Sequence, residues 1–252
     1  MRINNKDTGF LNGNNYLNSL DFKLNLEESD FLYLSKIDFL ENLVVDKDII
    51  HVGCVDHNIE SIEKKISKNK WLHKILDENS NKCIGVDIKE EEIKILGSKY
   101  GFDVHSIDIT KKNEILENKK FDYLLLPDVL EHIGSPVDFL TKLRDSHKEN
   151  INKIVITVPN AFNHRVFNMA AKNIEVINTD HRYWFTPYTI LKVLFDSGFK
   201  VEQLKTYDKA SKEKRMWVRK LKSIPLYRLI RKLFYNETFF TKGGIIVIAS
   251  FK

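Results

Sequence analysis

The stretch DIIHVGCVDH at residues 48–57 decides the fold, because a run of apolar residues ends there in a glycine and polar side chains. The apolar part predicts a strand that is covered on both faces, as parallel strands in α/β proteins are. Gly53 predicts a tight turn at which the backbone can approach a ligand closely. We therefore expect the first strand of a parallel sheet, with a binding site at its carboxyl end.

Further apolar runs follow this first strand and alternate with helical patterns. Strands then helices in alternation predict a doubly wound α/β sheet, here of seven strands. The other six predicted strands are residues 82–88, 103–109, 121–127, 153–159, 200–206 and 244–250.

The chain is expected to form one domain with four parts. Two helices between the strands have clear start signals, since Ser135 precedes Pro136 and Thr186 precedes Pro187, each pair offering a capping hydroxyl and then a proline. The second of these helices is expected to stop at Gly198. The first part, over 1–45, is an irregular segment to about residue 25 followed by a helix. The other three are a donor-binding core over 46–206, a basic amphipathic insertion over 207–242 and the last strand over 243–252.

Length and composition fit a cytoplasmic globular protein. The 252 residues, 42% of them hydrophobic, are enough for one sizeable core. No stretch approaches the roughly 20 apolar residues of a membrane span, and the polar start does not resemble a secretory signal. Cys54 and Cys83 lie in apolar runs, which predicts buried free thiols rather than disulfides or a zinc site.

The positive charge of the chain is local. Its formal net charge is +5, yet residues 205–232 hold eleven Lys or Arg against Asp208 and Glu213. Apolar residues between these charges, broken by Pro225, predict two amphipathic pieces. The plain interpretation is a solvated helical insertion; the alternatives are contact with an anionic membrane surface through 205–235, with a phosphorylated acceptor or with RNA.

Polar residues close several of the predicted strands, and they suit a nucleoside ligand. Asp87 is placed to accept hydrogen bonds from both hydroxyls of a ribose. Asp108 can accept from an adenine amino group, and Ile109 can cover the ring face. A nicotinamide cofactor would require G-x-G-x-x-G after the first strand, where this chain has Val55 and Asn58 at the later glycine positions. A dehydrogenase is therefore disfavoured.

With these residues in view, the chain resembles the class I methyltransferases. The resemblance lies in Gly53-Cys54, GVDI, the third strand-end acid and DVLEHI. It continues in IVITVPNAFN and DHRYWFTPYTILKVLFDSGF, which are similar to the branch of ubiquinone-type and glycan-modifying O-methyltransferases. It covers roughly 46–206 and the final strand. It implies a Rossmann-like sheet, mostly parallel with an antiparallel last strand and helices on both faces, and S-adenosyl-L-methionine as methyl donor.

The resemblance also implies a set of donor-binding residues. The chain departs from the family pattern in the first loop, where His51 replaces an acid and Val55 and His57 replace glycines, so that the loop is bulkier. A loop of this kind, followed by the WLHK segment at 71–74, resembles a subgroup among surface-polysaccharide enzymes. The predicted donor-binding residues are Gly53, Cys54, His57, Asp87, Ile88, Asp108, Ile109 and Asp128.

Histidines are the candidate bases for methyl transfer to a hydroxyl. The reaction is an in-line displacement, so the enzyme positions two reactants and supplies a base if the acceptor is a hydroxyl. His132, His164 and His181 are candidates because imidazole titrates near neutral pH. The plain interpretation of His181 and Tyr183 is that they only order their loop. The predicted catalytic set is His181, His132 and Asp128.

A metal-dependent alternative comes from a second resemblance. Asp128, Glu131, His132 and His181 are similarly spaced to residues that bind a divalent metal, manganese or magnesium, in small-RNA terminal 2′-O-methyltransferases. Asp128 stands where that family has a longer glutamate, and DVLEH also occurs in metal-free relatives, so no metal is assigned.

The leading functional hypothesis is an O-methyltransferase for a sugar or sugar-attached group in surface-polysaccharide biosynthesis. Its acceptor would be a small-molecule or lipid-linked glycan. The alternatives are an RNA ribose 2′-O-methyltransferase, with nucleic acid the less favoured partner, and a non-enzymatic binding module of the same fold.

Overall fold

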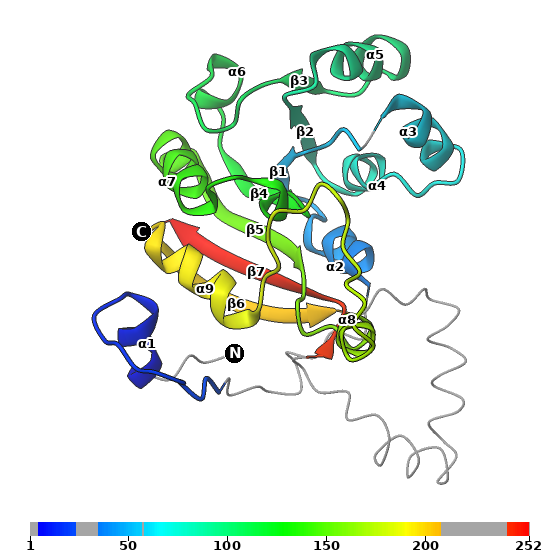
Figure 1. Ribbon diagram of the computed structural model, residues 1–252. Coiled ribbons are helices and arrows are strands. Elements are labelled where there is room, and N and C mark those ends of the chain that lie inside the picture. The colour runs from blue at the N-terminus through cyan, green and yellow to red at the C-terminus, as the bar shows by residue number, and fades with distance from the viewer. Residues whose placement is uncertain (1–4, 24–34, 57, 208–240, 252) are drawn as a thin grey trace, which may run out of the picture.

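The computed structural model describes residues 5–23, 35–56, 58–207 and 241–251 and contains one seven-stranded sheet (Figure 1). The strand order is β3-β2-β1-β4-β5-β7-β6. β7 runs antiparallel to both its neighbours, and every other pair is parallel. This confirms the predicted fold class. The strands are β1 (Asp48–Val52), β2 (Lys82–Asp87), β3 (Val104–Ser106), β4 (Phe121–Pro127), β5 (Ile151–Pro159), β6 (Phe199–Tyr207) and β7 (Gly244–Phe251).

Helices cover both faces of the sheet, because its apolar strands have to be buried on both sides. The helices are α1 (Asn5–Leu11), α2 (Lys36–Leu43), α3 (Ile59–Ile66), α4 (Leu72–Asn79), α5 (Glu90–Tyr100), α6 (Glu114–Glu117), the 3₁₀ turn η2 (Leu130–His132), α7 (Pro136–His147), α8 (His164–Ala170) and α9 (Pro187–Asp196).

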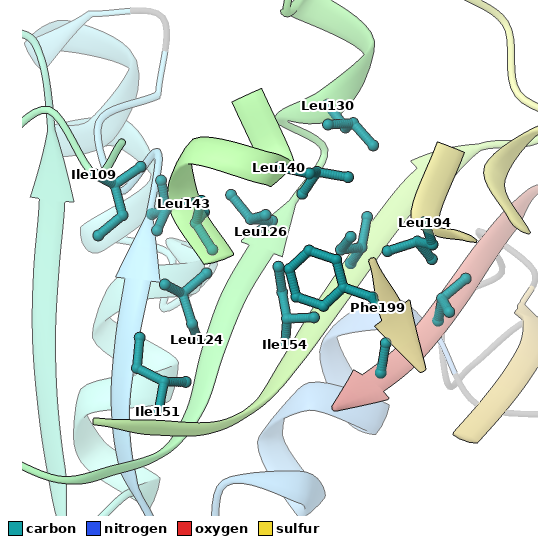
Figure 2. Close-up of a cluster of buried hydrophobic side chains, with 14 of the residues drawn as sticks. Ile109, Leu124, Leu126, Leu130, Leu140, Leu143, Ile151, Ile154, Leu194 and Phe199 are labelled. Atoms are coloured by element: carbon teal, nitrogen blue, oxygen red, sulfur yellow. The ribbon is translucent and has the colours of Figure 1, made fainter. Parts of the chain in front are cut away.

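The largest core lies between the sheet and the helices α7 and α9. Leu140 and Leu143 of α7 and Leu194 of α9 pack there onto the apolar side chains of β4 and β5 (Figure 2). The opposite face is covered by α2 and α4, with Leu40 and Leu76 fully buried against β1. The helices on both faces hold the strands in place, and with them the polar residues at the carboxyl ends of the strands.

The predicted helix starts are confirmed in position, and one is wrong in detail. α9 begins with a capping box in which Thr186 and Thr189 exchange hydrogen bonds, and Gly198 after its end has a φ of +76°. α7 begins at Pro136 as expected, but the hydroxyl of Ser135 makes no capping bond. Proline alone marks that start, since its fixed φ already suits a first helical residue.

Two further expectations need correction. The N-terminal segment is not wholly irregular, because α1 forms there and buries Leu11 completely. β3 covers only Val104–Ser106, so Asp108 and Ile109 lie in the loop after it. The helix expected before β1 is present from Lys36, and its earlier part lies outside the described residues.

The structure leaves the basic insertion untested, because residues 208–240 lie outside the described part of the chain. Cys54 and Cys83 are buried free thiols, as expected. Among the described residues, each helix is too short or too polar to cross a lipid bilayer.

Candidate functional site

A cleft of about 1120 Å³ opens at the carboxyl ends of β1, β2 and β4. It exceeds the usual size of a pocket for one small ligand, roughly 300–1,000 Å³, and can hold two reactants together. Every described residue of the predicted site lies on its walls: Gly53, Cys54, Asp87, Ile88, Asp108, Ile109, Asp128, His132 and His181. His57 lies outside the described residues, and His164 is exposed and does not line the cleft.

The first loop is held close to the neighbouring strands. Gly53 has a φ of +71°, and a Cβ at this position would stand 2.8 Å from Cγ2 of Val129. A side chain is therefore excluded both by the backbone conformation and by space. The N–H of Val55 donates to Oδ2 of Asp87 at 3.0 Å, which ties the loop to the end of β2.

Asp87 has the position but not the full acceptor capacity that we expected. Its Oδ1 accepts from the N–H groups of Ile88 and Lys89, and its Oδ2 from Val55. A carboxylate has about four lone-pair positions, so one remains for a ribose hydroxyl in this arrangement rather than two. Burial raises the pKa of Asp87, and these three backbone N–H groups oppose the shift.

Around Asp87 the cleft offers an apolar surface and a second acid. Ile88 is 78% exposed on the wall of the cleft, so it offers an apolar surface to a ligand. Ile109 also lines the cleft but is only 4% exposed, so Ile88 offers the larger surface to an adenine ring. Asp108 accepts from the hydroxyl of Thr110 at 2.6 Å, which lowers its pKa.

Behind the first loop, two buried histidines form a pair. Nδ1 of His51 lies 3.1 Å from Nδ1 of His73, so one ring donates and the other accepts. Burial, followed by the charge of the partner ring, holds the pKa of His51 well below its usual range, and burial lowers the pKa of His73 to about 4. Both rings are therefore neutral at pH 7.

The WLHK segment explains how the altered loop is supported. The indole N–H of Trp71 donates to the carbonyl of Cys54 at 3.2 Å, and His73 reaches His51. A Cβ on Gly85 would meet His73 Cε1 at 2.7 Å, so glycine on β2 makes room for the ring. The loop and the WLHK segment are thus one packed unit, and the histidine at 51 belongs to it.

Asp128 is fixed by an ion pair that the sequence did not indicate. It directly follows β4 with a φ of +54°, a conformation that aspartate tolerates better than most residues. The hydroxyl of Thr157 donates to its Oδ1 at 2.8 Å, and the Lys36 ammonium at the start of α2 pairs with its Oδ2. Lys36 also lines the cleft, so α2 contributes directly to the site.

Glu131, His132 and His181 come together at the other side of the cleft. The rings of His132 and His181 meet edge to face with centroids 4.8 Å apart. The carboxyl group of Glu131 is completely buried, and neither oxygen has a hydrogen-bond partner among the described residues. Burial, followed by the charge of Asp128, raises the pKa of Glu131 to about 8.

The segment 180–184 is anchored on the turn η2, which brings these groups together. Arg182 N–H donates to the carbonyl of Glu131 at 2.8 Å, and the Tyr183 hydroxyl donates to the carbonyl of Gly134 at 2.8 Å. Nδ1 of His132 lies 3.2 Å from the carbonyl and 3.4 Å from Oδ2 of Asp180. These bonds order the loop that contains His181 and Tyr183, as the plain interpretation expects, and the same loop also lines the cleft.

The same three residues could hold a metal ion. One ligand atom each from Glu131, His132 and His181 lie within 4.8 Å of one another. Asp128, the fourth residue of the metal-dependent alternative, is not in this group and is paired with Lys36 instead. The arrangement therefore differs from the four-residue set considered from the sequence.

Comparison with known proteins identifies the family. The family described as methyltransferase domain matches residues 32–204, so the chain belongs to it. It is a class I S-adenosylmethionine-dependent methyltransferase, and S-adenosylmethionine is its methyl donor. The exposed Ile88, the remaining lone pair of Asp87 and the Gly53 backbone fit this donor. No curated protein matches the chain.

Solved structures with the same fold are distant in sequence. An S-adenosylmethionine-dependent methyltransferase from Archaeoglobus fulgidus is 18% identical, with a TM-score of 0.47 over 85% of this chain and 94% of that one. Magnesium protoporphyrin IX methyltransferase from Synechocystis is 14% identical, with a TM-score of 0.48 over 86% and 82%. Small RNA methyltransferase HEN1 is 12% identical, with a TM-score of 0.53 over 91% of this chain but 27% of its own. At such identities the likeness concerns the fold alone.

Proposed function

We propose that this methyltransferase transfers the methyl group to a hydroxyl of a sugar, or of a group attached to a sugar, in surface-polysaccharide biosynthesis. The observation that supports a hydroxyl as the acceptor is the contact between Nδ1 of His132 and Asp180. If Nδ1 donates its hydrogen there, the other ring nitrogen, Nε2, keeps a lone pair for a proton.

His132 is the favoured base of the two histidines. Nε2 of His181 lies 3.1 Å from Nδ2 of Asn178, an amide nitrogen that donates, so its lone pair is already engaged. The Asp180 carboxylate beside His132 orients the ring and stabilises the imidazolium that forms when it takes up a proton. These contacts support His132 as the base, with His181 as the ring that packs against it.

His132 can take up the proton that the acceptor hydroxyl loses in the methyl transfer. When bound, S-adenosylmethionine supplies a methyl group that is attached to a positively charged sulfur. The sulfur is the leaving group: it keeps the electron pair of the broken C–S bond and becomes a neutral thioether. The acceptor oxygen forms the new O–C bond, and its proton passes to Nε2 of His132. The Lys36–Asp128 pair lines the same cleft and adds no net charge there.

The glycan assignment rests on the sequence resemblance of the first loop and of the 180–184 segment. The packing of Trp71 and His73 against the first loop supports treating the WLHK segment as part of that loop rather than as an unrelated helix. An anionic, sugar-containing acceptor also suits the basic composition of residues 205–232.

A panel of acceptors tests the proposal. Purified protein with radiolabelled donor should methylate sugar nucleotides or a lipid-linked glycan, and His132→Gln should slow transfer by about 10²–10⁴-fold. His164→Gln, at an exposed histidine that does not line the cleft, is the matched control and should leave the rate unchanged. Methylation of RNA but of no glycan, or an unchanged rate for His132→Gln, would contradict the proposal.

A further inference from the structure

Several apolar side chains are exposed in one stretch of the chain that lines part of the cleft. This stretch is residues 160–178, called here the α8 segment, which leaves the sheet after β5 and includes helix α8. No residue of helix α8 is buried, although it contains valine, phenylalanine and methionine. Ten large hydrophobic residues are exposed in the described part of the chain, and four of them are in this segment: Phe162, Phe167, Ile174 and Ile177.

The α8 segment also carries exposed cations. Arg165 and Lys172 are exposed, and neither forms an ion pair among the described residues. The exposed Glu175 is the only acid between 160 and 178. A surface that combines exposed aromatic and aliphatic side chains with unpaired cations fits the boundary between lipid headgroups and acyl chains.

The C-terminal end of the basic insertion, at Lys242, lies beside the α8 segment. The side-chain amide of Asn160, at the start of the α8 segment, donates to the carbonyl of Lys242 at 2.9 Å, just before β7 begins. Figure 1 shows α8 beside the first residues of β7. Eleven Lys or Arg occur in the sequence at 205–232, within the connection that ends at this point. Charge complementarity selects an anionic lipid surface over a neutral partner.

We infer that the α8 segment docks the enzyme on an anionic membrane surface. Arg165 and Ile177 line the cleft and also belong to this segment, so docking would bring the mouth of the cleft to the lipid surface. A lipid-linked acceptor could then reach His132 without leaving the membrane. Docking itself does not depend on the proposed function; the lipid-linked acceptor does rest on it.

Sedimentation with vesicles tests the docking without donor, acceptor or activity. The full chain should bind vesicles of phosphatidylcholine with about one third phosphatidylglycerol, and bind pure phosphatidylcholine far more weakly. Phe167→Asp, at a side chain that is 68% exposed, should weaken binding to the anionic vesicles about tenfold or more. Arg165→Ala should weaken it about fivefold, which corresponds to roughly 1 kcal/mol for one cation.

Matched controls separate this surface from general effects. Leu17→Asp changes another exposed apolar residue, and Lys200→Ala another exposed cation, and both should bind vesicles like the wild type. Phe167→Asp should keep the donor affinity of the wild type, because Phe167 does not line the cleft. The inference is wrong if the wild type ignores anionic vesicles, if it binds both vesicle types equally, or if Phe167→Asp binds as the wild type does.

Discussion

The buried His51–His73 pair should make the fold lose stability in mild acid. In the unfolded chain each imidazole titrates near pH 6.5, whereas burial lowers the pKa of His73 to about 4 in the folded protein. Between these values the unfolded chain binds more protons than the folded one. Stability from this group is therefore fully present above about pH 6.5 and is lost as the pH falls towards 4.

The size of the loss follows from the two pKa values of His73. At about pH 5 its unfolded form is almost fully protonated and its folded form is mostly neutral, which removes about 2 kcal/mol of unfolding free energy relative to about pH 7.5. The pKa of His51 is also well below its usual range, so the pair should lose more than His73 alone. For a domain with 5–15 kcal/mol of stability, this is a measurable fraction.

Urea denaturation at the two pH values measures the effect. His73→Gln removes one titrating ring and should reduce the pH-dependent loss by about 2 kcal/mol, whatever it does to stability at pH 7.5. His164→Gln, at an exposed histidine, should show the same pH dependence as the wild type. An unchanged loss in His73→Gln would show that this ring is not held neutral by burial, and the reasoning would be refuted.

Three further predictions concern the donor loop and the metal. Asp87→Ala should weaken donor binding in calorimetry by about 5- to 150-fold, because a buried hydrogen bond worth about 1–3 kcal/mol is lost; equal affinity would remove Asp87 from the site. Gly53→Ala should unfold at lower urea than Gly101→Ala, because both have a positive φ but only Gly53 would also clash with Val129; equal midpoints would contradict the close packing. Turnover should survive EDTA, since a base needs no metal; loss that manganese alone restores would instead assign Glu131 and the two histidines as metal ligands and favour RNA.

The sequence predicted the sheet well because parallel strands are buried on both faces. Residues 121–127 and 153–159 are mostly apolar runs, and such runs need no long-range information to be found. The strand-end residues Asp87 and Asp128 were found for the same reason, since the topology brings strand ends to one edge. By contrast, α1 shows no apolar periodicity, and its burial depends on packing against α9.

The missed parts of the site are contacts between residues far apart in the sequence. Lys36 and Asp128 are 92 positions apart, and nothing near Lys36 distinguishes it from other helical lysines. His51 and His73 are 22 positions apart, and a lone histidine in an apolar strand gives no sign of its partner. The resemblance of the first loop and the WLHK segment to one subgroup of enzymes was the signal that could have linked them, because it considers the two segments together.

The antiparallel β7 has a consequence for how this enzyme can diversify. Because β6 runs towards the cleft edge and β7 starts there, both ends of the connection, Tyr207 and Gly244, lie at that edge. The two strands hold each other in register, so the connection can lengthen without disturbing the sheet. Each doubling of a flexible connection costs only about 0.6 kcal/mol of closure entropy. New recognition elements can therefore be acquired at this one junction while the donor half of the cleft, built on β1 and β2, stays as it is.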